Sequence, residues 1–227
     1  MLLTEFIDTI NMKYIKVIVI GLMLGSNLHC DLDASNNGMT PLIVATQKNK
    51  RYVIEKLIQN GSDLNIQDNS GKTALMYAAI NGNVTIIRSL IHGGANLNLK
   101  DAHGNTALSH AVKNNRRDVV DALLTAGVSV ESPCPNSKTA LILASEKNYE
   151  RVVALLISKN AAVDAVDKYG NTALMYASRN GNTNILTQLI TAGANVNLKN
   201  SAKQTALMLA NGNVNITTPL IAAGATT

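Results

Sequence analysis

The residues of this chain that could ligate a metal ion or act in catalysis are few, and their spacing matches no known motif. There are four histidines and two cysteines: His29, His92, His103, His110, Cys30 and Cys134. No histidine belongs to an H-E-x-x-H pair, and the cysteines are too far apart in sequence for a C-x-x-C motif. We therefore expect no metal site and no cofactor, and we expect each histidine to be a surface or packing residue.

The two cysteines limit the chain to one disulfide at most. That bridge, between Cys30 and Cys134, requires that Cys30 stay in the mature protein. Cys134 lies between two prolines in the stretch S-P-C-P, which predicts a loop. We expect a solvent-facing or loop thiol without a function.

Three aspartates could act as general acids or bases, but their spacing indicates another role. Asp68, Asp101 and Asp167 lie at intervals of 33 residues or twice that number, and each opens a similar stretch: D-N-S-G-K-T, D-A-H-G-N-T and D-K-Y-G-N-T. An aspartate three residues before a glycine is typical of a turn. The sequence also lacks G-x-S-x-G and a phosphate-binding glycine loop. The chain is therefore not expected to be an enzyme.

The same interval runs through most of the chain and defines the element that must position every side chain. A threonine recurs every 33 residues, at Thr40, Thr73, Thr106, Thr139, Thr172 and Thr205. A fixed period of this length is the signature of a stacked repeat protein, in which each unit buries its apolar face against its neighbours. The composition agrees, since 46% hydrophobic residues with one Phe and no Trp suit helices packed through Ala, Leu and Ile.

One complete unit predicts a helix, a turn, a second helix and an extended loop. Thr73 can accept a backbone N–H at the start of the first helix, a cap worth ~1 kcal/mol. Leu75 and Ala79 then share one face of a short helix, and the second helix has an apolar stripe of Ile86, Ile87, Leu90 and Ile91. Gly94 follows where helices commonly end in a left-handed residue.

This unit resembles the ankyrin repeat, whose pattern runs D-x-x-G-x-T-P-L-H-x-A-A-x-x-G, followed by an Ile- and Leu-rich helix and G-A-x-V-N. The matching residues of one unit are Asp68, Gly71, Thr73, Leu75, Ala78, Ala79, Gly82, Ile86, Ile87, Leu90, Ile91, Gly94, Ala95 and Asn98. The resemblance implies an all-α solenoid of stacked helix-turn-helix units with projecting loops. It divides residues 35–227 into six repeats, near 35–67, 68–100, 101–133, 134–166, 167–199 and 200–227.

Three departures from the family pattern lead to expectations of their own. The family's histidine after T-P-L is replaced by Ile43, Met76, Ser109, Ile142, Met175 and Met208. In the family this histidine forms hydrogen bonds between adjacent loops, so we expect packing to replace those hydrogen bonds here. The fourth repeat has C-P-N-S in place of D-x-x-G and Asn160 at the helix-ending glycine, so its joint with repeat three should be the weakest. The sixth repeat is shorter, and Pro219 predicts that its second helix starts there, in a degenerate terminal cap.

Residues 1–30 form a segment of a different kind. Lys13 and Lys16 precede an apolar run from Val17 to Leu24, and small or polar residues follow. These are the parts of a secretory signal peptide, and the run is far shorter than the ~20 residues that span a bilayer. We expect export to the periplasm or the exterior, with residues 1–11 either an upstream extension or the result of a misplaced initiation site. The alternative is a cytoplasmic chain with an N-terminal helix. The residues before Cys30 match a lipoprotein signal poorly.

In the ankyrin family, partners usually meet the loop tips and the exposed end of the first helix, which together form a concave face. The resemblance therefore implies protein binding through the equivalent positions: Lys48, Lys72, Ile80, Asn81, Lys100, Lys113, Asn114, Lys138, Lys147, Tyr169, Arg179 and Asn180. The charged members of this set are all basic, and the chain has a formal charge of +5. We therefore expect an acidic protein surface as the partner, with Tyr169 and Ile80 as apolar anchors.

Other partner classes are less compatible with the sequence. There is no aromatic interleaving and no nucleic-acid motif, so binding to nucleic acid is not expected. A membrane would be contacted only through an uncleaved or lipidated leader, and the chain is expected to be a monomer. The alternatives to a simple binding module are a structural or protective scaffold, periplasmic or membrane-tethered, and a secreted effector that acts on host proteins.

Overall fold

The computed structural model describes residues 37–226. These residues form six pairs of α-helices and one 3-10 helix, with no β-strand among them. The first helices of the pairs are α3 (Pro41–Gln47), α5 (Ala74–Asn81), α7 (Ala107–Lys113), α9 (Ala140–Glu146), α11 (Ala173–Asn180) and α13 (Ala206–Leu209). The second helices are α4 (Arg51–Gln59), α6 (Val84–His92), α8 (Arg117–Thr125), α10 (Glu150–Ser158), α12 (Thr183–Thr191) and α14 (Val214–Ala222). The 3-10 helix η1 (Pro135–Ser137) precedes α9.

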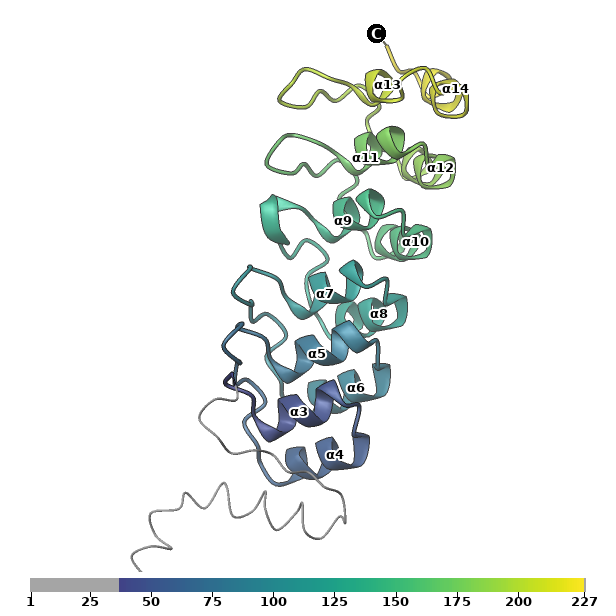
Figure 1. Cartoon of the computed structure of the whole chain (residues 1–227). Helices are drawn as coiled ribbons and strands as arrows, with labels where there is room; N and C mark the ends of the chain where they lie inside the picture. The colour runs from purple at the N-terminus through teal and green to yellow at the C-terminus, as the bar shows by residue number, and fades with distance from the viewer. Residues whose placement is uncertain (1–36, 227) are drawn as a thin grey trace, which may run out of the picture.

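The helix pairs stack on one another in chain order (Figure 1). The first helices form one row and the second helices lie beside them in another row, while the loop before each first helix projects from the opposite side. We call these loops fingers and number them by repeat, so that finger three precedes α7. The expected all-α solenoid of helix-turn-helix units with projecting loops is confirmed.

The repeated threonines start the first helices, as the sequence predicted. In all six of these helices, the threonine hydroxyl oxygen accepts the backbone N–H of the residue three positions later, at 3.2 to 3.3 Å. The second helices differ from one another, because α6, α12 and α14 are capped by Asn83, Asn182 and Asn213, whereas α4, α8 and α10 have no side-chain cap. Each cap is worth about 1 kcal/mol.

A continuous apolar core lies between the two rows of helices. In the second repeat, Leu75 and Ala79 of α5 and Ile86 and Leu90 of α6 are at most 1% exposed. The small alanine side chains let the two rows approach closely. Burial of this apolar surface, at roughly 25 cal/mol per Å², is the main stabilising contribution.

The turn between the two helices of a pair requires a residue with positive φ. Gly82 and Gly181 have φ values of 81° and 68°, and Asn115 and Asn148 take the same place at 55° and 60°. Asparagine tolerates this left-handed conformation better than most residues. Asn160 likewise has φ 61° just after α10, which confirms that it replaces the helix-ending glycine.

Adjacent fingers are joined by a backbone hydrogen bond that recurs along the array. At four of the five junctions, an N–H of one finger donates to a carbonyl of the preceding finger: Asn69 to Asn37 (2.8 Å), Ala102 to Ser70 (3.0 Å), Lys168 to Asn136 (3.2 Å) and Ser201 to Tyr169 (2.9 Å). Pro135 takes the donor's place in finger four and has no N–H. This hydrogen bond is therefore missing between fingers three and four.

The glycines of the fingers show the same interruption. A Cβ atom added to Gly71 or Gly170 would lie 2.6 or 3.0 Å from a backbone nitrogen of the next finger, whereas nothing lies within 4 Å of such an atom on Gly104. Finger four also contains η1, in which Asn136 and Ser137 have positive φ. The deviation expected between repeats three and four is confirmed, and the weakness of that joint stays a prediction.

Cys134 lies in a loop, which is one of the two expected placements, and its side chain is only 5% exposed. This burial raises the pKa of its thiol to about 11. One expectation was wrong. The second helix of repeat six does not start at Pro219, because α14 begins at Val214 and contains the proline. Ile216 and Leu220 of this helix are fully buried, so packing holds α14 in place across the missing hydrogen bond.

Among residues 37–226, no helix combines the length and the apolar character needed to cross a membrane. The leader predicted at residues 1–30, with Cys30, lies outside the described residues.

Candidate protein-binding face

The fingers and the first helices together form one surface, which we call the inner face. Lys113 of α7 donates to Asn105 Oδ1 of finger three. Lys138 of finger four lies 2.7 Å from Glu146 Oε1 at the end of α9, and its Nζ lies 4.9 Å from the ring centre of Tyr176 on α11. Side chains from different elements therefore meet on this surface.

Buried aspartates hold the fingers that form this face. Asp68 accepts the Lys72 N–H at 2.9 Å and the Tyr77 hydroxyl at 2.6 Å. Asp167 accepts the Asn171 N–H at 2.9 Å and the Tyr176 hydroxyl at 2.7 Å. Burial opposes ionisation of both carboxyls, but their hydrogen bonds outweigh it and lower the pKa of each. The turn-forming role expected of these aspartates is confirmed.

Repeat three has the same arrangement with a histidine in the tyrosine's place. Asp101 accepts the N–H groups of His103 and Asn105, and its Oδ2 lies 2.8 Å from His110 Nε2. Although the fully buried position of Asp101 opposes ionisation, these hydrogen bonds lower its pKa to about 2. Burial lowers the pKa of His110, with Asp101 acting in the opposite direction. At neutral pH, the neutral imidazole donates from Nε2 to the carboxylate.

Sequence reasoning missed these pairs, although the sequence contains their signal. Tyr77, His110 and Tyr176 stand nine residues after the finger aspartate of their own repeat. The repeats that begin with serine, cysteine or asparagine have an aliphatic residue there instead, namely Val44, Leu143 and Leu209. A side chain that can donate a hydrogen bond is therefore present only where there is a carboxylate to accept it.

Four of the seven predicted cations contact other side chains of the inner face, and their surroundings differ. Lys72 Nζ donates to Ser70 Oγ at 3.0 Å, and Lys113 Nζ donates to Asn105 Oδ1. The Arg179 guanidinium lies 5.4 Å from the ring centre of Tyr176. These three form no ion pair with any carboxylate of the described residues. Lys138 instead pairs with Glu146, and although burial opposes its charge, this hydrogen bond raises its pKa. Lys48, Lys100 and Lys147 also have no ion pair among the described residues, so six of the seven predicted cations are unpaired.

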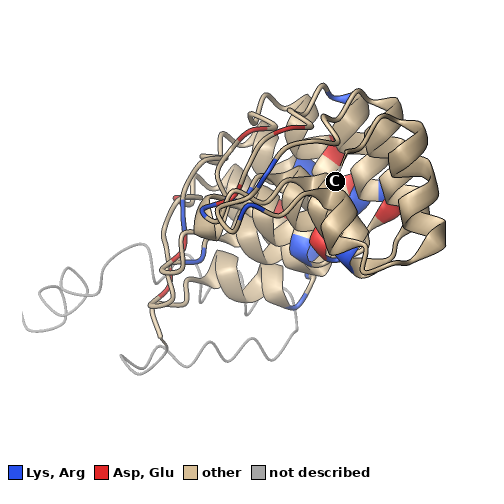
Figure 2. Cartoon of the chain, turned by 90° about the horizontal axis from the view of Figure 1, so that it is seen from above, with Lys and Arg blue, Asp and Glu red and all other residues tan. Residues whose placement is uncertain are grey.

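The other predicted contact residues lie along the same face. Lys48, Lys100 and Lys147 are exposed, and Ile80 at the end of α5 is half-buried. Tyr169 in finger five is 56% exposed, and Val166 in the same finger, which the sequence did not single out, is 50% exposed. Figure 2, seen along the stack, shows basic and acidic residues interspersed on the fingers and helices.

Two predicted contact residues, Asn81 and Asn180, are used to join repeats. The side-chain amide of Asn81 donates to the carbonyls of Thr46 and Gln47, at the end of the preceding first helix. Asn180 donates in the same way to two carbonyls at the end of α9, at 3.0 and 3.4 Å. The Gln47 and Glu146 carbonyls, which the helix ends leave unpaired, gain a donor in this way, while the Thr46 and Ser145 carbonyls also accept the N–H groups of Asn49 and Asn148. The amides therefore stabilise the array.

Other side chains donate to the ends of first helices at the junctions between repeats two and three and between repeats three and four. Arg116 Nε donates to the Ile80 carbonyl at 3.0 Å, and the Tyr149 hydroxyl donates to the Lys113 carbonyl at 3.2 Å. Asn114, also predicted as a contact, donates to the His110 carbonyl of its own helix at 2.8 Å. Polar ties between repeats are therefore kept in a chain that lacks the family's histidine.

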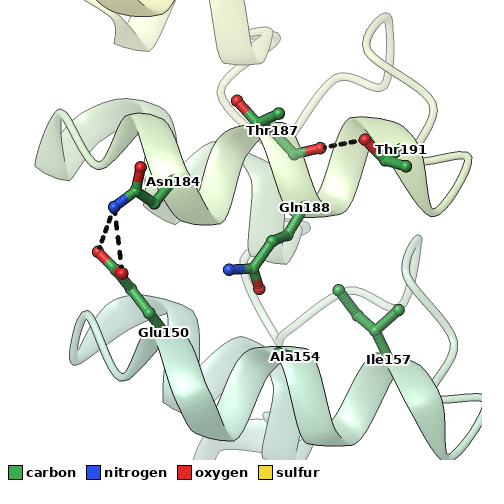
Figure 3. Close-up of a pocket in the computed structure, with 7 residues that line it drawn as sticks. All are labelled: Glu150, Ala154, Ile157, Asn184, Thr187, Gln188 and Thr191. Atoms are coloured by element: carbon green, nitrogen blue, oxygen red, sulfur yellow. Dashed lines mark hydrogen bonds between the residues drawn. The ribbon is translucent and has the colours of Figure 1, made fainter.

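A groove of about 620 Å³ lies on the row of second helices, between α10 and α12 (Figure 3). Asn184 donates to both carboxylate oxygens of Glu150 at 3.2 Å, while Gln188 Oε1 is buried without a hydrogen-bond partner. The lining residues include one carboxylate and neither histidine nor cysteine. This groove therefore offers no pair of groups for acid–base or nucleophilic catalysis.

The 33-residue unit, its capped helices and its fingers agree with a family model. Ankyrin repeats match in three copies, over residues 45–134, 128–200 and 160–227. The chain belongs to the ankyrin-repeat family. Within residues 37–226 of this ankyrin-repeat protein, no group of three or more His, Cys, Asp or Glu side chains is placed to hold a metal ion. No curated protein sequence matches the chain significantly.

Two solved structures show the same fold over most of the chain. The ankyrin repeat domain of Bcl-3, a member of the IkappaB protein family, is 30% identical with a TM-score of 0.79, and the match covers 84% of this chain and 88% of that one. A chain in the complex of the predatory endopeptidase Bd0816 from Bdellovibrio bacteriovorus with the immunity protein Bd3460 is 32% identical with a TM-score of 0.72. That match covers 82% of this chain and 98% of the other.

Proposed function

We propose that this ankyrin-repeat protein is a non-catalytic module that binds an acidic surface of another protein through its inner face. Ankyrin repeats are protein–protein interaction modules, and one of the similar structures is itself a complex with an immunity protein. The observation that carries the proposal is the set of inner-face cations, Lys72, Lys113 and Arg179 among them, that lack an ion-pair partner among the described residues.

The buried aspartates affect how strongly the inner face attracts an acidic partner. Asp68, Asp101 and Asp167 each accept several hydrogen bonds from their own finger and repeat, so they offer no acceptor to a partner. Their negative charge nevertheless reduces the positive potential of the inner face. We therefore expect association with an acidic partner to be moderately salt-dependent.

Charge alone does not supply the affinity. An exposed ion pair contributes under ~1 kcal/mol and is screened by salt. Tyr169 and Val166, each at least half exposed in finger five, provide the apolar contact that such a surface needs at its centre. Asn81 and Asn180 contribute indirectly, because their amides keep neighbouring repeats in register.

The test is a pair of matched charge reversals measured against a partner captured with the wild-type chain. The inner variant is Lys72→Glu, Lys113→Glu and Arg179→Glu, and the control is Arg88→Glu, Arg117→Glu and Arg151→Glu on the exposed side of the second helices. Both triple variants change the formal charge equally. Loss of three pairs should weaken binding by about 10- to 100-fold in the inner variant only. Equal losses in the two variants, or wild-type binding by the inner variant, would contradict the proposal.

We also propose that residues 1–30 direct export and are removed. The support is the order of basic, apolar and small residues in that segment. Mass spectrometry of the chain from its native source is the test. A mature N-terminus between about Asn27 and Asp31 in an extracytoplasmic fraction is expected, and an intact N-terminus in the cytoplasm would overturn the proposal.

A further inference from the structure

Repeat six leaves open the face that every earlier repeat buries against its successor. Met208 of α13 is 48% exposed, whereas the residues at the same position of the other repeats are at most 1% exposed: Ile43, Met76, Ser109, Ile142 and Met175. Ile221 of α14 is 60% exposed. Its equivalents in the earlier repeats are packed against the core: Ile58, Ile91, Leu124, Ile157 and Ile190.

Contacts elsewhere in the array show what these positions normally touch. A Cβ atom added to Gly93 would lie 2.9 Å from Cγ2 of Ile58, which belongs to the preceding repeat. The groove between α10 and α12 is lined by Glu150 and Ile157 on one side and by residues of the next repeat on the other. Positions equivalent to Ile157 and Glu150 therefore face the following repeat, and in repeat six they are Ile221 and Val214.

We call Leu207, Met208, Val214 and Ile221 the terminal face. Val214 is 70% exposed and Leu207 is half-buried. No described residue covers this set. A cluster of exposed aliphatic side chains and a methionine of this kind is typical of a protein interaction surface.

The charges of repeats one and six indicate which surface binds the terminal face. From Gln204 to Thr227 the sequence contains no charged side chain, so two terminal faces can approach without repulsion. Helices α3 and α4, with the loop between them, carry four cations and one anion: Lys48, Lys50, Arg51, Lys56 and Glu55. Head-to-tail stacking would place Lys50 and Lys56 against the apolar terminal face, because their equivalents Arg116 and Gln188 face the preceding repeat. It would remove these two cations from water, which is costly.

We propose that the terminal face is a homodimer interface, in which two copies of this chain meet through α13 and α14 about a two-fold axis. Closed two-fold pairing buries the same apolar surface on both copies and leaves neither terminal face open. The inner faces of both copies stay accessible, so that a dimer would present two of them. This proposal replaces the monomer expected from the sequence and does not depend on the partner proposed above.

Sedimentation velocity of the full chain tests the dimer over about 1 to 300 µM, the range in which a small interface associates. Wild type is expected to shift from the monomer mass to twice that mass. Ile221→Lys, which places two like charges across the axis, should stay monomeric. Tyr52→Lys is the matched control, since Tyr52 is 56% exposed on α4, and it should dimerise as wild type does.

A cysteine at the same position keeps the test valid if the lysine disturbs α14. Ile221→Cys should give a disulfide-linked dimer under mild oxidation faster than wild type or Tyr52→Cys. The proposal is overturned if wild type remains monomeric over the whole range, or if Ile221→Lys dimerises normally. It is also overturned if assemblies larger than dimers form and Tyr52→Lys abolishes them, because that result would indicate head-to-tail stacking.

Discussion

Replacing Asp101 by asparagine tests whether the buried finger carboxylates stabilise the array. The Asp101 side chain has no exposed surface, and its pKa is lowered from 3.8 to about 2 by hydrogen bonds from Asn105, His110 and His103. A pKa difference of this size between the folded and unfolded states corresponds to about 2 kcal/mol. We therefore expect Asp101→Asn to lower the free energy of unfolding by about 2 kcal/mol at pH 7.

The pH dependence distinguishes this cause from a general loss of packing. Because the folded pKa of Asp101 is depressed, its contribution is complete above the unfolded pKa of 3.8 and is lost as the pH falls toward about 2. The difference between wild type and Asp101→Asn should therefore disappear across this window. Urea unfolding followed by circular dichroism at several pH values measures it.

Two further variants sharpen the result. Asp118→Asn is the control, because that side chain is 75% exposed and pairs with Arg117 at the surface, and it should change stability by less than ~0.5 kcal/mol. His110→Tyr restores the pairing of repeats two and five. Since burial lowers the pKa of His110, wild type should lose stability as the pH falls below 6.5, and the tyrosine variant should not. If Asp101→Asn matches wild type at pH 7, or if its deficit persists at pH 2, the reasoning is refuted.

Three other predictions concern the joints of the array. Ser145 and Ser178 have buried hydroxyls without a hydrogen-bond partner among the described residues. Alanine at either position should therefore raise the free energy of unfolding, measured in urea, by about 1 kcal/mol. An unchanged or lower value would show that these hydroxyls are hydrogen-bonded. Asn180→Ala should lower the free energy of unfolding by about 1 kcal/mol because the Glu146 carbonyl at the end of α9 loses its donor. The exposed Asn184→Ala should have little effect, and equal effects of the two variants would contradict the role of Asn180 in joining repeats. Native-state hydrogen exchange should divide the array between repeats three and four, where Pro135 removes the hydrogen bond between fingers, and uniform protection along all six repeats would rule this out.

The fold was predictable because each element repeats a local rule. Thr73 and its five equivalents cap helices through contacts within three residues, and the apolar stripe of α6 follows from helical periodicity. Packing overrides such rules at two positions. Pro219 stays inside α14 because Ile216 and Leu220 are buried on either side of it. Cys134 is buried, although the prolines around it are typical of an exposed loop.

The inner face was predictable in position but not in detail. Exposed residues such as Tyr169 and Lys147 follow from their place in the repeat. The role of Asn180 does not, because its amide donates to carbonyls about 35 residues earlier in the chain, and no local pattern contains that contact. The pairing of Asp101 with His110 was visible in the sequence, but only by comparing which repeats have both a finger aspartate and a polar residue nine positions later.

Lysine-reactive footprinting of the complex with its captured partner tests the central claim most directly. We predict that partner binding protects the inner-face residues Lys48, Lys72, Lys113 and Lys147 from labelling. Lys56 and Lys159, on or just after second helices, should react as they do in the free chain. Protection of Lys56 and Lys159, with inner-face lysines unchanged, would show that the partner binds elsewhere and would contradict the account.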